Sequence, residues 1–259
     1  MGNFVPERAF APPRVFMGHM ATASATSGSE EAELVRVLTV DHGLRDTIPP
    51  EDRELALQQL VARRVSICAG PWDDTAYHDS DALGLLVLEG LITRDVELAG
   101  TRARELLGPE DVLRPWDDDT GLSPIAPRIS WTVLEPMSFA VLDRRWALLA
   151  ARWPDLGVEI LSRVLRRSRW LIVLLTIAGL RGVEERVMLF FWHLASNWGR
   201  VTPEGTLVPS SLTHEVIADV IGARRPSVTT AISELQNRGD LERVDDGWLL
   251  KTPPSTSAT

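Results

Sequence analysis

Four arginines near the C-terminal end of the sequence are spaced so that a short helical unit would bring them together. They are Arg224, Arg225, Arg238 and Arg243. A guanidinium can bond the O6 and N7 atoms of guanine bidentately, and it can also neutralise a phosphate. These residues therefore indicate contact with nucleic acid, provided that neighbouring elements hold them on one face.

Two short helices joined by a tight turn are predicted around the arginine pair. The first begins at Thr213, whose side chain is expected to cap its N-terminus. Gly222 can take the positive φ angle that a sharp change of direction needs. The second helix spans residues 225–237, tolerates Pro226 in its first turn and ends at Gly239. Its expected core residues are Val228, Ala231, Ile232 and Leu235.

Further elements on both sides complete this unit. An apolar helix is expected from residue 183 to about residues 197–199, a short strand at 207–209, and a hairpin over 241–250 that turns at Asp246-Gly247. Helix, sharp turn, helix and hairpin make a winged helix-turn-helix. In such a unit the second helix lies in the major groove and the first crosses the DNA backbone.

A long helix is predicted upstream, over residues 155–181. Its stripe has alternating spacings of three and four and consists of Leu161, Val164, Ser168, Leu171, Leu175 and Ala178. Such a spacing suits a helix-helix seam as well as a core stripe. Leu165, Ile172 and Leu174 beside it are apolar too. We therefore expect the helix to contact its own domain on one side and the helix of a second copy on the other.

Short apolar runs with turn signals between them fill residues 61–142. The runs are residues 65–67, 83–88, 96–98, 129–134 and 139–142, and Gly-Pro, Glu-Gly and Ala-Gly pairs separate them. Short strands at this spacing predict a compact antiparallel sandwich or barrel.

Composition excludes several classes of protein. With 36 acidic against 27 basic side chains, the formal charge is -9, so nucleic acid must be met by a local basic patch. A single cysteine, Cys68, permits no intramolecular disulfide and fits a reducing compartment. The most apolar stretch, residues 171–180, is shorter than the ~20 residues of a membrane span. The protein is therefore expected to be cytoplasmic.

Metal and catalytic sites have little support in the sequence. The histidines lack the spacings of a metal site; they are His19, His42, His78, His193 and His214. A haem site at Cys68 and His78 is less favoured than a buried neutral cysteine. A cation site at residues 116–119 is less favoured than solvated aspartates. No motif for a nucleotide phosphate or a catalytic serine occurs, so we expect no enzyme, no cofactor and no metal.

The order of these parts resembles the Crp/Fnr superfamily of bacterial transcription regulators, over roughly residues 34–250. The strongest match is residues 212–235, from Leu212-Thr213-His214-Glu215 to Ser233-Glu234-Leu235, which is similar to the family's DNA-binding signature. Weaker matches in the right order are residues 86–90, 107–111 and 141–144. The resemblance implies an α+β chain with an N-terminal cyclic-nucleotide-binding-like antiparallel β-roll, a long dimerisation helix and a C-terminal winged helix-turn-helix.

The implied domain boundaries follow from the resemblance and the composition together. We expect a disordered tail over residues 1–30, the β-roll over 31–154 and the dimerisation helix over 155–181. The DNA-binding domain is expected over 182–251, and a polar tail over 252–259.

The resemblance also assigns DNA contacts. Arg225 occupies the position of the family's base-reading arginine, whereas Pro226 and Thr230 replace its usual glutamate and a further arginine. Arg224, Ser227 and Thr229 are expected to contact a phosphate or a nearby base. Thr230 is shorter than the arginine it replaces and suits contact with a methyl group or a single hydrogen bond. Thr213 and His214 are expected at the phosphates, and Arg243 on the wing.

The chain departs from the family where a cyclic nucleotide would bind. The Gly-Glu pair that holds the ribose is replaced by Arg114-Pro115 or thereabouts, and the Arg-Ser pair by Pro127-Arg128 or Arg128-Ile129. A lone arginine such as Arg128 is more often a surface charge than a phosphate ligand. We therefore expect no binding of cyclic AMP.

The leading hypothesis is a homodimeric regulator that binds an inverted repeat in double-stranded DNA, with RNA polymerase as a candidate further partner. Two alternatives remain: a protein-interaction scaffold with this fold, and a sensor of an unfamiliar small ligand. An exposed Arg225 favours the regulator, because a scaffold has no need of it. Acidic residues slightly outnumber basic ones even in residues 183–251, so DNA binding should need both half-sites of a dimer.

Overall fold

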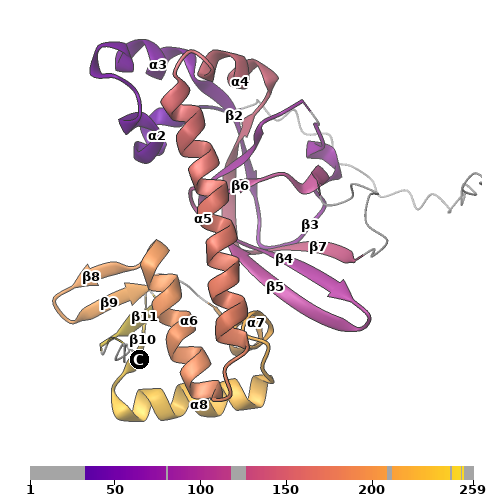
Figure 1. The fold of residues 1–259 in the computed structure, drawn as a ribbon, viewed down its shortest axis with the longest axis vertical. Coiled ribbons are helices and arrows are strands. Elements are labelled where there is room, and N and C mark those ends of the chain that lie inside the picture. The colour runs from indigo at the N-terminus through magenta and orange to yellow at the C-terminus, as the bar shows by residue number, and fades with distance from the viewer. Residues whose placement is uncertain are drawn as a thin grey trace, which may run out of the picture. The chain divides into compact units, whose positions relative to one another are not determined.

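The computed structural model describes residues 33–79, 81–117, 127–208, 212–245, 247–251 and 253. The tail expected over residues 1–30 lies outside the described residues, and so does all but Pro253 of the tail expected at the C-terminus. Within the described chain, an antiparallel sheet, a long helix and a winged helix-turn-helix follow one another, as the sequence predicted (Figure 1).

The first sheet is antiparallel throughout, in the order β1-β2-β7-β4-β5, with β3 also paired to β7 and β6 to β4. Its strands are β1 (Leu34–Arg36), β2 (Val61–Ile67), β3 (Gly70–Trp72), β4 (Gly84–Leu98), β5 (Thr101–Leu107), β6 (Val112–Leu113) and β7 (Arg128–Leu142). Helices not foreseen from the sequence precede β2, namely α1 (Val37–Val40), α2 (His42–Asp46) and α3 (Arg53–Gln59). Their apolar side chains share one core with α4 (Arg144–Ala150).

Two pairs of predicted short strands are in fact the single long strands β4 and β7. Gly90 suggested a turn, but it lies at a register shift inside β4 with a φ of 86°. A Cβ at this position would lie 2.4 Å from the carbonyl oxygen of Pro136 on β7, so only glycine fits. The strand therefore bends without ending.

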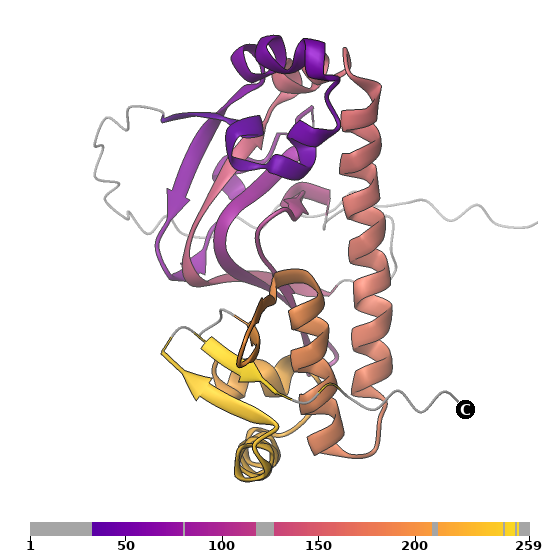
Figure 2. The same cartoon turned by 90° about the vertical axis from the view of Figure 1, so that its left-hand side faces the viewer.

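Helix α5 (Pro154–Ala178) runs alongside the sheet, and α6 (Val183–Trp198) lies beside its second half (Figure 2). Its inward side buries a spaced set of side chains, namely Leu156, Ile160, Arg163, Trp170, Leu174 and Ile177. Of the predicted stripe, Leu161, Val164, Ser168 and Leu175 are exposed, whereas Leu171 and Ala178 are half-buried. None of the described helices is long and apolar enough to cross a membrane.

The C-terminal elements match the predicted order, apart from β8, which the sequence did not predict. After α6 come β8 (Arg200–Thr202), β9 (Gly205–Val208), α7 (His214–Val220), α8 (Arg225–Arg238), β10 (Leu241–Val244) and β11 (Gly247–Leu250). The strands form a second antiparallel sheet, β10-β11-β9-β8. One apolar core joins α6, α7 and α8 to Trp170 and Leu174 of α5 and to Leu91 and Leu106 of the first sheet.

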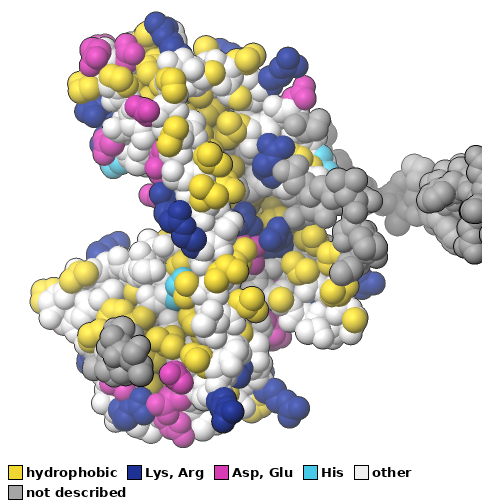
Figure 3. Space-filling model, in the orientation of Figure 1, with side chains coloured by type: hydrophobic (Ala, Val, Ile, Leu, Met, Phe, Trp, Pro, Cys, Tyr) yellow, Lys and Arg dark blue, Asp and Glu magenta, His cyan; other side chains and the backbone are white. Residues whose placement is uncertain are grey.

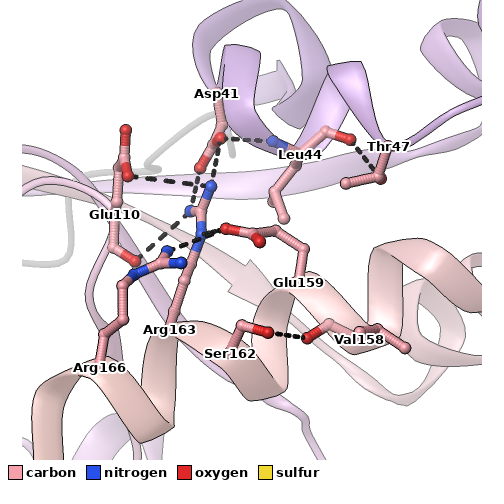
Figure 4. Close-up of polar contacts among 9 residues, drawn as sticks. All are labelled: Asp41, Leu44, Thr47, Glu110, Val158, Glu159, Ser162, Arg163 and Arg166. Carbon is pink, nitrogen blue, oxygen red and sulfur yellow. Dashed lines mark hydrogen bonds and ion pairs between the residues drawn. The ribbon is translucent and has the colours of Figure 1, made fainter. Parts of the chain in front are cut away.

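A buried ion pair holds α5 against α2. Arg163 donates from Nη1 and Nη2 to the two carboxylate oxygens of Asp41, at 2.5 and 2.8 Å, and both side chains are only 4% exposed (Figure 4). Nε of Arg163 also donates to Glu159 at 3.1 Å. Removing one partner of such a pair leaves a buried charge without compensation, which costs several kcal/mol.

The turn between β5 and β6 carries a second buried acid. The amide of Gly108 donates to the Asp111 carboxylate at 2.9 Å, and the Asp111 carbonyl accepts from Val87. Burial is the largest influence on this carboxyl and raises its pKa to about 6, although the Gly108 amide and Arg167 favour the ionised form. The carboxyl therefore titrates above its ordinary range.

We expect Asp111→Asn to change how stability depends on pH. Because the folded state raises the pKa of Asp111, it holds the proton more tightly than the unfolded chain. The contribution of Asp111 to the free energy of unfolding therefore falls as pH rises from about 4 to about 6. Asparagine keeps the acceptor for Gly108 and carries no charge. Relative to wild type, the variant should gain up to about 3 kcal/mol between pH 4 and pH 7.

Urea unfolding of both proteins at several pH values measures this difference. A free-energy difference between the two proteins that stays constant from pH 4 to pH 7 would contradict it.

Candidate nucleic-acid interface

The N-terminus of α7 is built as the sequence predicted. The hydroxyl of Thr213 accepts from the amide of Val216 at 3.3 Å, so it serves as the N-cap. The turn after α7 uses Gly222 at a φ of 63°, and Gly239 at 79° ends α8. These local signals fix the angle between α7 and α8.

Helix α8 has one buried and one exposed side. Val228, Ala231, Ile232 and Leu235 are buried, as expected, and pack in the core shared with α6 and α7. The exposed side carries the predicted DNA-contact residues of this helix and its N-cap, namely Arg224, Arg225, Ser227, Thr229 and Thr230. The hydroxyl of Thr230 donates to the carbonyl of Pro226 at 3.2 Å.

His214, Thr229 and Arg225 join α7 to the first turn of α8. Nδ1 of His214 lies 3.0 Å from the Thr229 hydroxyl, which in turn donates to the carbonyl of Arg225 at 3.1 Å. The network holds the first turn of α8 next to the start of α7.

Two arginines on other elements, Arg225 on α8 and Arg243 on β10, affect the pKa of His214. Burial lowers the pKa of His214, and Arg225 and Arg243 lower it further. The imidazole is therefore neutral at pH 7, and the charge of this surface comes from the guanidinium groups. Thus α7, α8 and β10 bring His214, Arg225 and Arg243 into electrostatic contact, as a basic patch for DNA requires.

The wing holds its arginine in place. The guanidinium carbon of Arg243 on β10 lies 4.8 Å from the ring centre of Trp248 on β11, a cation-π geometry. Glu242 next to it pairs with Lys251 at 2.5 Å. The stacking holds the Arg243 side chain against β11.

Arg238 does not belong to this surface, although the sequence placed it there. It lies at the C-terminal end of α8, where it pairs with Glu184 on α6 and with Asp240. Both carboxylates raise its pKa. Arg238 thus fastens α8 to α6.

Aromatic side chains fill the inside of the first sheet. Trp72, Tyr77, Trp131 and Phe139 pack against one another with ring centres 5.3 to 5.9 Å apart. Arg114, which the sequence aligned with the family's ribose-holding pair, donates to the carbonyls of Ala82 and Leu83. It therefore supports the fold of the roll.

Other candidate sites from the sequence fare differently. Arg128 is exposed at the start of β7, opposite Glu97, as a surface charge would be. Cys68 was expected to be buried, which is wrong, because it is exposed just beyond the end of β2. His78 pairs with Asp74 at 2.8 Å. The described residues contain no cluster of acids, histidines or cysteine that would hold a metal ion, and residues 118 and 119 lie outside them.

Sequence reasoning missed a cluster of arginines on α5, which we call the α5 arginine cluster: Arg163, Arg166, Arg167 and Arg169. The spacings of three and four between Arg163 and the next two members would have shown that they share one side of the helix. The sequence gives no indication that the β5–β6 turn and α6 lie opposite the α5 arginine cluster.

Comparison with known proteins identifies the C-terminal unit. Residues 185–253 match the family described as the Crp-like helix-turn-helix domain. No curated protein is matched by the sequence.

Solved structures share the fold across most of the chain. A cyclic nucleotide-binding domain containing protein from Listeria monocytogenes EGD-e is similar with a TM-score of 0.57 and 16% identity, over 81% of this chain and 95% of the other. A CooA mutant from Carboxydothermus hydrogenoformans gives a TM-score of 0.54 and 18% identity, over 86% and 93%. A CRP family transcriptional regulator from Thermus thermophilus gives 0.50 and 18%, over 73% and 92%. Residues 185–253 are therefore a Crp-like helix-turn-helix domain, and the chain as a whole shares the fold of these solved structures.

Proposed function

We propose that the protein is a homodimeric transcription regulator that binds a specific inverted repeat in double-stranded DNA. The observation that carries the proposal is the exposed first turn of α8, where Arg225 lies beside His214 and within electrostatic reach of the wing. A helix-turn-helix that served only as a scaffold would not need this guanidinium. Its action on DNA, together with a lone exposed cysteine, fits the cytoplasm.

The dimer is supported by the outward side of α5. Val158, Leu161, Leu165, Ile172 and Leu175 are all exposed apolar residues, and most are separated by three, four or seven positions. We call this set the α5 seam; it is apparent as hydrophobic side chains along the helix (Figure 3). Spacings of this kind bury their side chains against a second helix of the same pattern. A second copy supplies that helix by symmetry.

The proposed DNA contacts fall into two kinds. Arg225 would read a guanine edge, because the first turn of α8 enters the major groove. Arg224, Ser227, Thr229 and Thr230 lie beside it on the exposed side of the helix. The hydroxyl of Thr213 is used as a cap, so a phosphate near α7 would be met by backbone amides and by His214. Arg243 would meet phosphate at the wing.

Selection of bound sequences from a random pool of duplex DNA tests the proposal. A two-fold dimer should select an inverted repeat with half-site centres about 34 Å, or one helical turn, apart. No enrichment over Arg225→Ala at low salt would refute the regulator function.

The seam can be tested by Ile172→Asp with Leu175→Asp. These side chains are 64% and 71% exposed in the single chain, so the charges should disturb dimerisation and not the core of the protomer. Sedimentation should show folded monomers. The matched control is Val201→Asp, which charges an 85% exposed apolar residue on β8 and should leave the dimer intact. An unchanged dimer in the double variant would show that the seam is wrongly placed.

Arg225→Ala should cost on the order of 1 to 3 kcal/mol of binding free energy at a guanine-containing site and flatten the base preference there. Arg243→Ala should weaken binding to all DNA sequences alike and reduce the salt dependence of the affinity by about one charge. Arg238→Ala is the control, because this arginine is already paired with Glu184 and Asp240. Binding isotherms at several salt concentrations separate these effects. Equal losses of base preference in all three variants would count against the assignment.

Cyclic AMP is expected not to bind with micromolar affinity. Trp72, Trp131 and Phe139 occupy the inside of the roll, and Arg114 is engaged with backbone carbonyls. Calorimetric titration measures this directly, and a micromolar dissociation constant would overturn the expectation.

A further inference from the structure

A cavity of about 640 Å³ lies beside α5, outside the aromatic core of the roll. One wall is the turn between β5 and β6, with Glu110 and Asp111, and another is the C-terminal end of α6, with Trp198. The third wall is the α5 arginine cluster. The surface is hollowed in this region, and basic side chains gather at the hollow (Figure 3). Its volume is in the range of small-molecule sites.

The lining has more positive than negative charge. All four members of the α5 arginine cluster line the cavity, against the two carboxyls of Glu110 and Asp111. The Asp111 carboxyl accepts from the Gly108 amide and is held in the turn. The walls therefore favour an anionic occupant.

Two of the four guanidinium groups are fully engaged by the protein. Arg163 pairs with Asp41 and Glu159, and its side chain is 4% exposed. Arg167 forms two hydrogen bonds to the carboxylate of Glu105, at 2.7 and 2.9 Å. These arginines form the fixed base of the wall.

The other two guanidinium groups have donors to spare. Arg166 is 52% exposed and reaches one oxygen of Glu159 at 2.9 Å, the same oxygen that already accepts from Arg163 (Figure 4). Arg169 is exposed, and it forms no ion pair with any residue the structure describes. Neither group has a carboxylate of its own, so both can bind an added anion.

Aromatic rings form the rest of the wall. Trp170 stacks on His193 with ring centres 3.5 Å apart, and Trp198 lies 5.8 Å from Trp170. Burial lowers the pKa of His193, so this ring adds no charge at pH 7. The buried indole N–H of Trp170 has no acceptor among the described residues. The rings therefore make this side of the wall aromatic and uncharged.

We propose that this cavity binds a small polyanion, one with two or more carboxylate or phosphate groups, held by Arg166 and Arg169. A guanidinium fork matches either group bidentately. The low-polarity rings of Trp170 and Trp198 strengthen these charge-assisted hydrogen bonds by excluding water from one side.

The position of the cavity makes the ligand an effector, and this step rests on the proposed function. The occupant would contact the turn of the first sheet, α5 of the seam and α6 of the DNA-binding unit at once. A ligand that binds one arrangement of these three elements better than another shifts their equilibrium by that difference in affinity. DNA affinity would then depend on the polyanion.

Calorimetric titration of the full-length dimer without DNA tests the site, with pyrophosphate and citrate as probes at constant ionic strength. We expect saturable binding of at least one probe, and the one that binds more tightly distinguishes phosphate from carboxylate chemistry. Arg166→Gln with Arg169→Gln should weaken binding at least tenfold. The control is Arg145→Gln with Arg181→Gln, which removes the same charge from two exposed arginines outside the cavity and should change affinity less than twofold.

The proposal would be overturned if neither probe bound saturably. It would also be overturned if the control variant lost as much affinity as the cavity variant. Thermal unfolding confirms that both double variants are folded. DNA binding is measured separately on wild type, so a failure here leaves the proposed regulator intact. If DNA is bound, the tighter probe should change DNA affinity in wild type and leave it unchanged in the cavity variant; a change of equal size in both would contradict the effector role.

Discussion

The buried ion pair between Arg163 and Asp41 sets the position of α5, on which the other sites depend. Both oxygens of Asp41 are engaged, and Asp41 also caps α2 by accepting from the amide of Leu44 at 2.9 Å. A Cβ on Gly43 would lie 2.8 Å from Nη2 of Arg163, so a larger residue there would displace the guanidinium. Two buried charges of this kind are stable only in good geometry. They therefore oppose rotation or sliding of α5 against the roll.

The rotation of α5 about its axis determines which of its residues face the core, the solvent and the cavity. With Arg163 turned inward, Trp170 and Leu174 on the same side reach the core of the C-terminal unit. The α5 seam is then left facing outward, and Arg166 and Arg169 flank the cavity. Dimer contact, cavity and DNA-binding unit are thus positioned by one element, since residues on a helix keep fixed angular relations. A change at any one of them bears on the other two through α5.

How much the sequence predicts depends on how local the determinants are. The helix-turn-helix is specified by neighbours in sequence, such as Thr213 at a cap and Gly222 and Gly239 at turns, and its elements were predicted closely. Strands β4 and β7 were divided wrongly, because the bend at Gly90 depends on Pro136 across the sheet. The pair of Arg163 with Asp41 joins residues 122 positions apart, and no periodicity reveals it. Exposure of Cys68 and the pairing of Arg238 likewise depend on the tertiary fold.

The acidic balance of the chain conflicts less with a DNA-binding surface once the ion pairs are known. Asp219 on α7 pairs with Arg104 of β5 at 3.2 Å, and Arg104 also binds Asp95. Glu184 forms an ion pair with Arg238, and Glu242 forms one with Lys251. Each of these acids is neutralised by a base within the protein, and Asp219 is turned toward the first sheet. Arg225 remains exposed with no ion pair among the described residues, and its positive charge lowers the pKa of the neighbouring His214. Because interactions between exposed charges are screened within about 8 Å at physiological salt, the field at a phosphate depends on this local arrangement more than on the net charge.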